Sequence, residues 1–325
     1  MASKFRIDQL RALGSTVFHG IGDSLSIRAS QNHYIRHFSD ASSPPLSPAG
    51  SSLPPPQNVE LQTAPQPEKM NINASTTSSV NQLELAKFSA ISETWWDAEG
   101  PFKPLHALNP TRVSFIRSTL CRHFRRDPCS VRPFEGLKFI DVGCGGGILS
   151  EPLARMGATV TGIDMVDNNI KIARVHADLD PVTSTIEYYC TTAENLVEQQ
   201  KEFDAVIASE VIEHVANPAG FCQSLAALTV ANGATIVSTI NRSMRAFATA
   251  IVAAEYILRW LPIGTHQWSS LLTPEELVLI LQRASISVEE MAGFVYNPLT
   301  GQWSLSDDTS VNYIAFGKKI SQQTD

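Results

Sequence analysis

The sequence has few cysteines and no paired cysteine motif. Its five cysteines are odd in number, and no two of them form a Cys-x-x-Cys pair. A disulfide framework needs an even set of cysteines, and a cysteine-rich zinc site needs closely spaced pairs. We therefore expect a protein of a reducing compartment, without either feature.

An excess of basic residues is also missing. The chain has 25 Lys and Arg residues against 32 Asp and Glu residues, a formal net charge of −7. Proteins that bind the phosphate backbone of nucleic acids present a basic surface. Nucleic acid is therefore not an expected partner.

No apolar run is long enough to span a bilayer. The apolar stretch 246–258 has 13 residues, whereas a spanning helix needs about 20. Its apolar residues share one helical face, and it is flanked by Arg242, Arg245 and Arg259. We expect residues 241–264 to form an amphipathic insert that lies on an anionic membrane surface or, alternatively, a lid over the active site.

The N-terminal region differs from the rest in composition. Residues 1–40 contain five basic residues, three aspartates and no glutamate, which is typical of an organelle transit peptide, mitochondrial or other, with an ordinary disordered tail as the alternative. Eight prolines fall within residues 41–67, so residues 41–80 are predicted to be a disordered linker. The folded domain is expected at 81–325.

Beyond residue 81 the pattern indicates an α/β fold. Residues 81–135 are predicted to form an N-terminal helical cap, with a long loop at 100–112. Strands then alternate with helices, which favours a doubly wound, mostly parallel, Rossmann-like sheet. The seven expected strands are 137–142, 158–164, 185–190, 203–208, 234–239, 286–291 and 310–316.

The stretch Leu137 to Gly147 contains the strongest motif. A buried strand ends in Asp141, and glycines follow at positions 143, 145 and 147. Glycine permits positive φ and close approach of the backbone to a ligand, while the next helix directs its N-terminus at the same point. A nucleotide-like ligand is therefore expected at Asp141, Gly143 and Gly145.

The spacing of these glycines argues against a dinucleotide. The dinucleotide fingerprint requires a third glycine where this chain has Ile148. The observed motif is Asp-x-Gly-x-Gly-x-Gly. Asp164 ends the following strand, 21 residues beyond Gly143, where an acid accepts hydrogen bonds from ribose hydroxyls.

Further polar residues fall at the carboxyl ends of the expected strands. Glu194 follows the third strand and is placed to reach an adenine amino group, and Ser209 ends the fourth. Arg112 precedes the sheet and can hold a ligand carboxylate through bidentate hydrogen bonds. These residues should converge because the carboxyl ends of parallel strands share one edge of the sheet.

Glu210, Glu213 and His214 have i, i+3, i+4 spacing. A helical turn there would place two carboxylates and an imidazole on one face, where they can hold a metal ion. The alternative is a helix start that is acidic because of the macrodipole. The spacing alone leaves both open.

Several motifs together resemble the ubiquinone-biosynthesis O-methyltransferases, a branch of the class I S-adenosylmethionine-dependent methyltransferases. The resemblance covers residues 81–317. Its motifs are Ala86-Lys-Phe-Ser-Ala, Trp95-Trp-Asp, Phe102-Lys-Pro-Leu-His, Asn109-Pro-Thr-Arg, Asp141-Val-Gly-Cys-Gly-Gly-Gly-Ile-Leu, Gly162-Ile-Asp and Ser209-Glu-Val-Ile-Glu-His.

The resemblance implies a role for each matching residue. Arg112, Gly143, Asp164 and Ser209 would contact S-adenosylmethionine. Magnesium would be bound by Glu210, Glu213 and His214. The implied substrates are a catechol acid, 3,4-dihydroxy-5-polyprenylbenzoate, and a later demethylubiquinol. The implied location is the matrix side of the mitochondrial inner membrane, peripherally bound and within a multi-subunit complex.

Methyl transfer to a phenol needs help at neutral pH because the pKa of a phenol is about 10. A metal bound to the catechol would favour the phenolate, with Glu210 as one of its ligands. His106 or His214 is the alternative, acting as a general base. Two rival functions share this pattern: a nicotinamide-dependent oxidoreductase, and a non-catalytic assembly subunit of a quinone-biosynthesis complex.

Overall fold

A computed structural model describes Ser79 and residues 81–246, 268–297 and 299–320. The expected transit peptide at 1–40 lies outside the described residues, as do the linker at 41–80 apart from Ser79 and nearly all of the expected insert. Among the helices described, none is long and apolar enough to cross a membrane.

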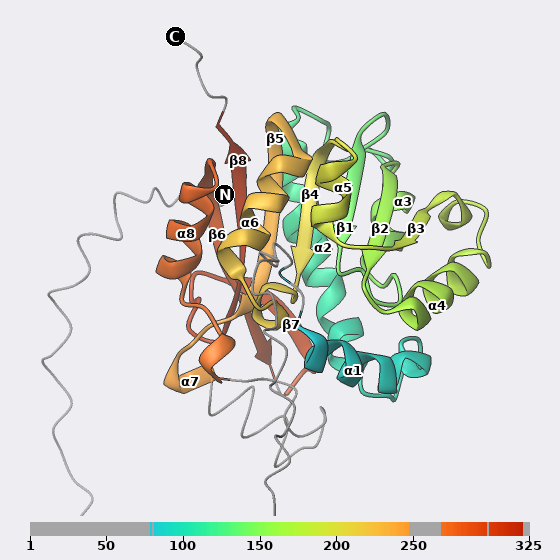
Figure 1. The fold of residues 1–325 in the computed structure, drawn as a ribbon, viewed down its shortest axis with the longest axis horizontal. Helices are drawn as coiled ribbons and strands as arrows, with labels where there is room; N and C mark the ends of the chain where they lie inside the picture. The colour runs from blue at the N-terminus through green and yellow to red at the C-terminus, as the bar shows by residue number, and fades with distance from the viewer. Residues whose placement is uncertain (1–78, 80, 247–267, 298, 321–325) are drawn as a thin grey trace, which may run out of the picture. The chain divides into compact units, whose positions relative to one another are not determined.

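One eight-stranded sheet forms the centre of the fold, in the order β3-β2-β1-β4-β5-β8-β6-β7 (Figure 1). Strands β1 to β5 pair in parallel, whereas β8, β6 and β7 pair antiparallel. The doubly wound, mostly parallel prediction is confirmed. The strands are β1 (Lys138–Val142), β2 (Thr159–Asp164), β3 (Glu187–Cys190), β4 (Phe203–Ser209), β5 (Thr229–Ile240), β6 (Ile286–Asn297), β7 (Gln302–Ser306) and β8 (Asn312–Lys319).

Helices cover both faces of this sheet. Helix α8 begins at a capping box, as the spacing of Thr273 and Glu276 predicts. The Thr273 hydroxyl accepts a hydrogen bond from the backbone N–H of Glu276, and the Glu276 carboxylate accepts one from the backbone N–H of Thr273. The α-helices are α1 (Gln82–Ile91), α2 (Lys103–His123), α3 (Ser150–Arg155), α4 (Asp167–Ala177), α5 (Ala193–Glu198), α6 (Pro218–Leu228), α7 (Met244–Ala246) and α8 (Pro274–Arg283).

The predicted loop at 100–112 is wrong, because α2 already begins at Lys103. Its prolines suggested a loop, yet Pro104 lies in the first turn, where a missing N–H costs no helical hydrogen bond. Pro110 is inside the helix. The helix therefore brings Arg112 to the sheet on a rigid element.

The expected number of strands, seven, is also wrong. Strand β7 pairs with β6 as a hairpin at the edge of the sheet. Its sequence, Gln-Trp-Ser-Leu-Ser, places only two apolar residues among polar ones. Such a half-exposed edge strand has a weak hydrophobic pattern.

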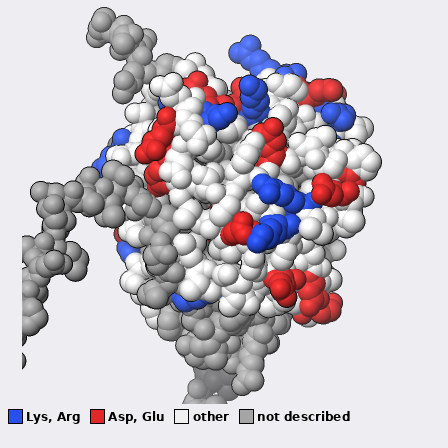
Figure 2. Space-filling view, turned by 45° about the vertical axis from the view of Figure 1, so that its right-hand side comes forward, with Lys and Arg blue, Asp and Glu red and all other residues white. Residues whose placement is uncertain are grey.

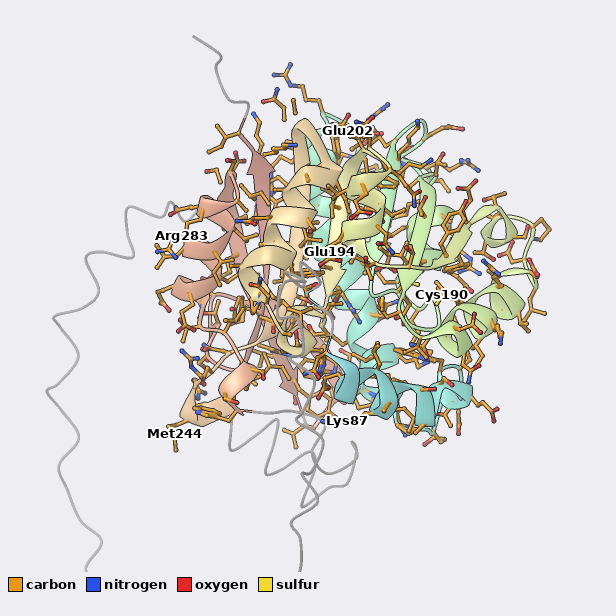
Figure 3. The ribbon with its side chains drawn as sticks, viewed as in Figure 1. Lys87, Cys190, Glu194, Glu202, Met244 and Arg283 are labelled. Carbon is orange, nitrogen blue, oxygen red and sulfur yellow. The ribbon has the colours of Figure 1, made fainter. Side chains whose placement is uncertain are left out.

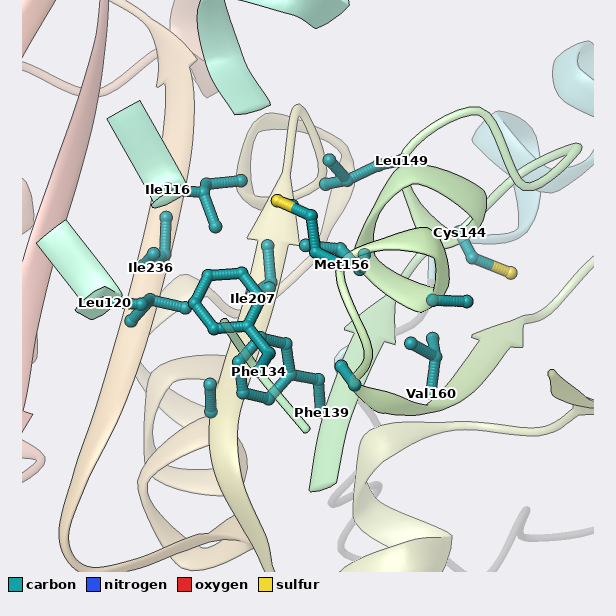
Figure 4. Packing of buried hydrophobic residues seen from close by; sticks show 14 of the residues in the cluster. Ile116, Leu120, Phe134, Phe139, Cys144, Leu149, Met156, Val160, Ile207 and Ile236 are labelled. Carbon is teal, nitrogen blue, oxygen red and sulfur yellow. The ribbon is translucent and has the colours of Figure 1, made fainter. Parts of the chain in front are cut away.

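The two faces of the central strands pack into separate cores. Phe139 and Ile207 face α2 and the segment containing Phe134 (Figure 4), whereas Ile140 and Val206 face α6 and α8. This alternation follows from the two-residue period of a strand. Buried on both faces, the strands hold their carboxyl ends as a fixed frame for a site.

Candidate functional site

The carboxyl ends of β1, β2 and β4 border a cavity of about 800 Å³. Helix α1 lies across these strand ends (Figure 1) and contributes to the lining. The structure brings nine predicted site residues to this cavity: Arg112, Gly143, Gly145, Asp164, Glu194, Ser209, Glu210, Glu213 and His214.

The glycine turn after β1 leaves no room for side chains. Gly143 and Gly145 have φ of +73° and +53°, and a Cβ on them would lie 2.5 Å from Val211 and 2.4 Å from Trp95. The N–H of Gly143 donates to the carbonyl of Ile163 at 2.8 Å. The glycines therefore allow the backbone to approach a ligand closely, and the N–H of Gly143 is hydrogen-bonded within the fold.

Asp164 supports this turn from the end of β2. Its carboxylate accepts hydrogen bonds from the N–H of Gly145 at 3.0 Å, the N–H of Val166 at 2.8 Å and Nδ2 of Asn169 at 3.1 Å. Burial raises the pKa of Asp164, and these donors oppose that shift. The carboxylate is thus fixed at the mouth of the turn, where the sequence predicts a ribose contact.

Trp95 joins the N-terminal cap to the glycine turn. Its indole Nε1 donates to Asn169 at 2.8 Å, and its ring stacks on Phe102 with a centroid separation of 3.6 Å. The adjacent Trp96 donates to the carbonyl of Gly146 at 2.8 Å. The cap is therefore part of the site's wall.

Arg112 starts a chain of hydrogen bonds across the site. Its Nη1 donates to Ser209 Oγ at 2.6 Å, Ser209 lies 2.7 Å from Ser238 Oγ, and Ser238 donates to Glu210 Oε1 at 2.7 Å. Burial lowers the pKa of Arg112, opposed by the charges of Glu210 and Asp141. In the described part of the chain, Nε of Arg112 is buried without a hydrogen-bond partner.

Glu210 and Glu213 form an acidic pair beside this chain. Glu213 is buried and accepts a hydrogen bond from Thr239 Oγ1 at 2.9 Å, while its Oε1 has no partner among the described residues. Burial, then the charge of Glu210, raises the pKa of Glu213 to about 7. A cation would relieve both the burial cost and the repulsion.

The predicted helical trio is wrong in its geometry. Only residues 212–214 form a turn, and it is a 3₁₀ turn. Glu210 precedes it with φ of +58°, a left-handed conformation uncommon outside glycine. His214 Nδ1 lies 2.9 Å from Glu84 Oε2, so the imidazole is directed to α1. Among the described residues, no three His, Cys, Asp or Glu side chains are arranged as a metal site.

Two predicted site residues lie outside the cavity lining. Asp141 is buried, accepts a hydrogen bond from Ser150 at 2.6 Å and is not part of the cavity lining. His106 Nε2 lies 2.8 Å from the carbonyl of Trp95. A ring nitrogen facing a carbonyl must donate, so this nitrogen cannot act as a base there.

Glu194 lies in the first turn of α5, which Thr192 caps (Figure 3). Its Oε1 accepts from the hydroxyl of Ser79 at 2.6 Å and from the backbone N–H of Ser79 at 3.2 Å. The carbonyl of Ser79 accepts from the N–H of Ala216 at 2.7 Å. Ser79 is therefore hydrogen-bonded both to Glu194, the residue predicted to contact adenine, and to Ala216.

The charged surface is of mixed sign. On the face drawn in Figure 2, Lys and Arg side chains lie among Asp and Glu side chains. Pairs such as Lys103–Glu99 at 2.5 Å are exposed and contribute at most about 1 kcal/mol each. The face drawn therefore presents no field of one sign to a partner.

Sequence reasoning missed four residues that complete the site: Glu84, Trp95, Asn169 and Ser238. Glu84 and Trp95 belong to the cap, whose position over the sheet is a tertiary property. Ser238 had a local signal, because it is a polar residue near the carboxyl end of an apolar strand.

Comparison with known proteins agrees with this geometry. Residues 140–237 match a family model described as a methyltransferase domain. The chain is 73% identical over 247 residues to the mitochondrial ubiquinone biosynthesis O-methyltransferase of Arabidopsis thaliana, covering 76% of this chain and 77% of that protein. It is 48% identical over 243 residues to the ubiquinone biosynthesis O-methyltransferase of Methylobacterium nodulans, covering 75% and 97%.

A solved structure shares the fold at low sequence identity. Magnesium protoporphyrin IX methyltransferase from Synechocystis PCC 6803 aligns with a TM-score of 0.51 and 17% identity, over 72% of this chain and 94% of that one. This likeness concerns the Rossmann-like arrangement of sheet and helices alone.

Proposed function

This chain belongs to the ubiquinone biosynthesis O-methyltransferases and is an S-adenosylmethionine-dependent methyltransferase, and we propose that it methylates a ring hydroxyl of a polyprenylated catechol in ubiquinone biosynthesis. One observation carries the proposal: the glycine turn and Asp164 share a single cavity with the acidic pair Glu210 and Glu213. In this proposal the cofactor site lies next to the acceptor site.

The residues present fit S-adenosylmethionine. Gly143 and Gly145 line the cavity with backbone alone, and a side chain at either position would collide with Val211 or Trp95. Arg112 has a buried Nε without a partner in the described structure, which suits the cofactor's carboxylate. Asp164 would accept from the ribose hydroxyls, and Glu194 from the adenine amino group if Ser79 gives way.

The reaction forms an O–CH₃ bond as the S–CH₃ bond of the sulfonium breaks. Sulfur keeps the electron pair and leaves as the neutral thioether of S-adenosylhomocysteine. The oxygen must attack in line and must lose its proton. The protein's part is to hold donor and acceptor in that line, from opposite ends of one cavity, and to accept the proton.

His214 is our proposed general base. It lines the cavity, and Glu84 holds its Nδ1 at 2.9 Å. A carboxylate behind an imidazole fixes its tautomer and orientation, as a proton acceptor requires. His106, the other candidate, does not line the cavity.

We also propose a magnesium ion at Glu210 and Glu213, without His214 as a ligand. The buried unpartnered Oε1 of Glu213 fits a cation, and magnesium is held by one or two carboxylates with water or substrate oxygens completing its shell. When bound, such an ion lowers the pKa of a coordinated phenol.

The rest of the cavity suits an apolar tail. Phe88 of α1, Leu105 of α2, Phe294 of β6 and Trp303 of β7 all line it. A polyprenylated ring would bury its tail against such a wall, which favours association by about 25 cal/mol per Å² of apolar surface. Both 3,4-dihydroxy-5-polyprenylbenzoate and demethylubiquinol carry this tail.

Proposals on location depend on residues outside the described structure. The composition of residues 1–40 supports import into mitochondria, and the relative from Arabidopsis thaliana is named as mitochondrial. The pattern at 241–264 supports peripheral contact with an anionic membrane, placed here on the matrix side of the inner membrane. Membership of a quinone-biosynthesis complex is part of the same proposal.

A methyl-transfer assay tests the function. The chain should convert a soluble short-chain 3,4-dihydroxybenzoate analogue with S-adenosylmethionine into the monomethyl ether. Calorimetric titration should show binding of S-adenosylmethionine and none of NAD, because position 148 is isoleucine. Preferred NAD binding would support the oxidoreductase instead, and cofactor binding without any methylation would support the assembly subunit.

A further inference from the structure

Five side-chain atoms of the described residues are buried and lack a hydrogen-bond partner: Asn109 Oδ1, Arg112 Nε, Tyr188 Oη, Glu213 Oε1 and Asn312 Oδ1. Three of these residues, Arg112, Glu213 and Asn312, line the same cavity. A buried polar atom without a hydrogen-bond partner destabilises the fold. The presence of three such atoms at one cavity indicates that ligands complete these hydrogen bonds.

Arg112 and Glu213 already have proposed ligands, the cofactor's carboxylate and a cation. Asn312 does not. Its side chain is 8% exposed, and it is the first residue of β8. The cavity lining includes the apolar residues Ile240, Val311 and Phe294, together with Arg245 and Asp308, which pair with each other. No protein group in the described structure therefore accounts for its carbonyl oxygen.

The sheet topology separates Asn312 from the cofactor. Strand β8 is three positions from β1, with β4 and β5 between them. At about 4.8 Å per strand, that is about 14 Å from the glycine turn after β1. Because β8 runs antiparallel, its first residue pairs with Ile240 at the carboxyl end of β5. Asn312 therefore lies at the same edge of the sheet as the glycine turn, on the side proposed for the acceptor.

The position relative to the acidic pair supports this assignment. The residue after Asn312 is Tyr313, which pairs with Thr239 of β5. Thr239 in turn donates to Glu213 at 2.9 Å. Because successive residues of a strand point to opposite faces of the sheet, Asn312 and the Tyr313–Thr239 pair lie on opposite faces. Asn312, Glu213 and Glu210 nevertheless line the same cavity, so a planar acceptor bound between them would have a polar group on each side.

We propose that Asn312 binds the ring hydroxyl of the acceptor that is not methylated, and so selects catechols over simple phenols. This inference rests on the proposed O-methyltransfer. A hydroxyl both donates and accepts, so it satisfies either orientation of the amide. The bond fixes the rotation of the ring and leaves the adjacent hydroxyl facing the cofactor.

The test replaces the amide by an apolar group of similar size, Asn312→Leu. Binding of the short-chain catechol and of its analogue lacking the second hydroxyl is measured by calorimetry with S-adenosylhomocysteine present. The unmodified chain should bind the catechol about tenfold more tightly, the contribution of one hydrogen bond. In Asn312→Leu the ratio should fall below about twofold, with unchanged affinity for S-adenosylmethionine.

Thermal stability distinguishes ligand binding from a structural role. Replacing an unpartnered buried amide by leucine should leave Tm unchanged or raise it. The matched control is Asn109→Leu: Asn109 also has an unpartnered Oδ1, but its Nδ2 donates to the carbonyl of Ile148 at 2.8 Å and it does not line the cavity. This control should lower Tm and keep the tenfold ratio.

The outcomes that overturn the inference are distinct from those that overturn the function. A tenfold ratio retained in Asn312→Leu, or a Tm lowered as in the control, refutes the role of Asn312 alone. Failure of the unmodified chain to bind or methylate any catechol refutes the proposed function and this inference with it.

Discussion

His214 of the turn after β4 and Glu84 of α1 form a partly buried hydrogen-bonded pair, with Nδ1 and Oε2 2.9 Å apart. The hydrogen bond to His214 lowers the pKa of Glu84 to about 2. Burial opposes protonation of His214, yet the bond to Glu84 raises its pKa above the usual value. The pair therefore ties the N-terminal cap to the residue we propose as the base.

The first prediction is that Glu84→Gln and His214→Asn each lower the free energy of unfolding by about 1.5–3 kcal/mol, the contribution of a charged hydrogen bond. The double variant should cost little more than either single one, because both remove the same bond. Chemical denaturation at about pH 5.5 measures this. Lys87→Ala removes the exposed partner of Glu84 and should cost less than about 1 kcal/mol.

This pair also has a predictable pH window. The lowered pKa of Glu84 gives stability that is present above its usual pKa of 4.5 and is lost as pH falls towards 2. The raised pKa of His214 gives stability that is present below 6.5 and is lost at higher pH. Full additivity of the two variants between these values would contradict the coupling.

Much of the arrangement of strands and helices was predictable from the sequence, because it depends on local signals. The glycine turn followed by Asp164 marks two strand ends that parallel pairing must bring together. Helix α8, for example, begins at a capping box whose Thr273 and Glu276 are visible in the sequence. Strand β7 was not predicted, because an exposed edge strand has little hydrophobic pattern.

The rest depends on contacts between distant residues. Glu84 reaches His214 across 130 positions of the chain, and Trp95 reaches Asn169 across 74. The spacing of Glu210, Glu213 and His214 suggested one helical face, but Glu210 takes a left-handed φ stabilised by Ser238 of another strand. No local pattern specifies such a conformation.

The second prediction concerns Asp164. Asp164→Ala should weaken S-adenosylmethionine binding by about 1.5–3 kcal/mol, because it removes a charged hydrogen bond to the ribose and the support of Gly145. Calorimetric titration measures the change. The control is Asp167→Ala, which removes a nearby exposed acid paired with Lys171. This variant should bind S-adenosylmethionine with unchanged affinity. An unaltered affinity in Asp164→Ala would exclude this residue from the site.

The third prediction is a pH effect at Asp141. Burial, opposed by the hydrogen bond from Ser150, raises the pKa of this carboxyl to about 6. Its contribution to stability is therefore present below about 3.8 and is lost as pH rises through 6. Asp141→Asn keeps the acceptor for Ser150 and cannot ionise. Relative to the parent, it should gain about 2–3 kcal/mol between pH 4 and pH 8, measured by denaturation; an equal difference at both values would contradict the shift.

The fourth prediction tests magnesium at Glu210 and Glu213. Excess EDTA should abolish methylation and added magnesium should restore it, because the ion would lower the pKa of the phenol. Glu210→Gln and Glu213→Gln should each reproduce the chelated state, since each leaves the ion with a single charged protein ligand.

His214→Asn should retain magnesium binding, measured by calorimetry without substrate, while losing turnover. Magnesium binding without turnover would identify His214 as the base and Glu210 and Glu213 as the ligands. We expect this result because the imidazole of His214 is directed to Glu84. Full turnover in excess EDTA would remove the metal from the mechanism, and lost magnesium binding in His214→Asn would restore the imidazole as a ligand.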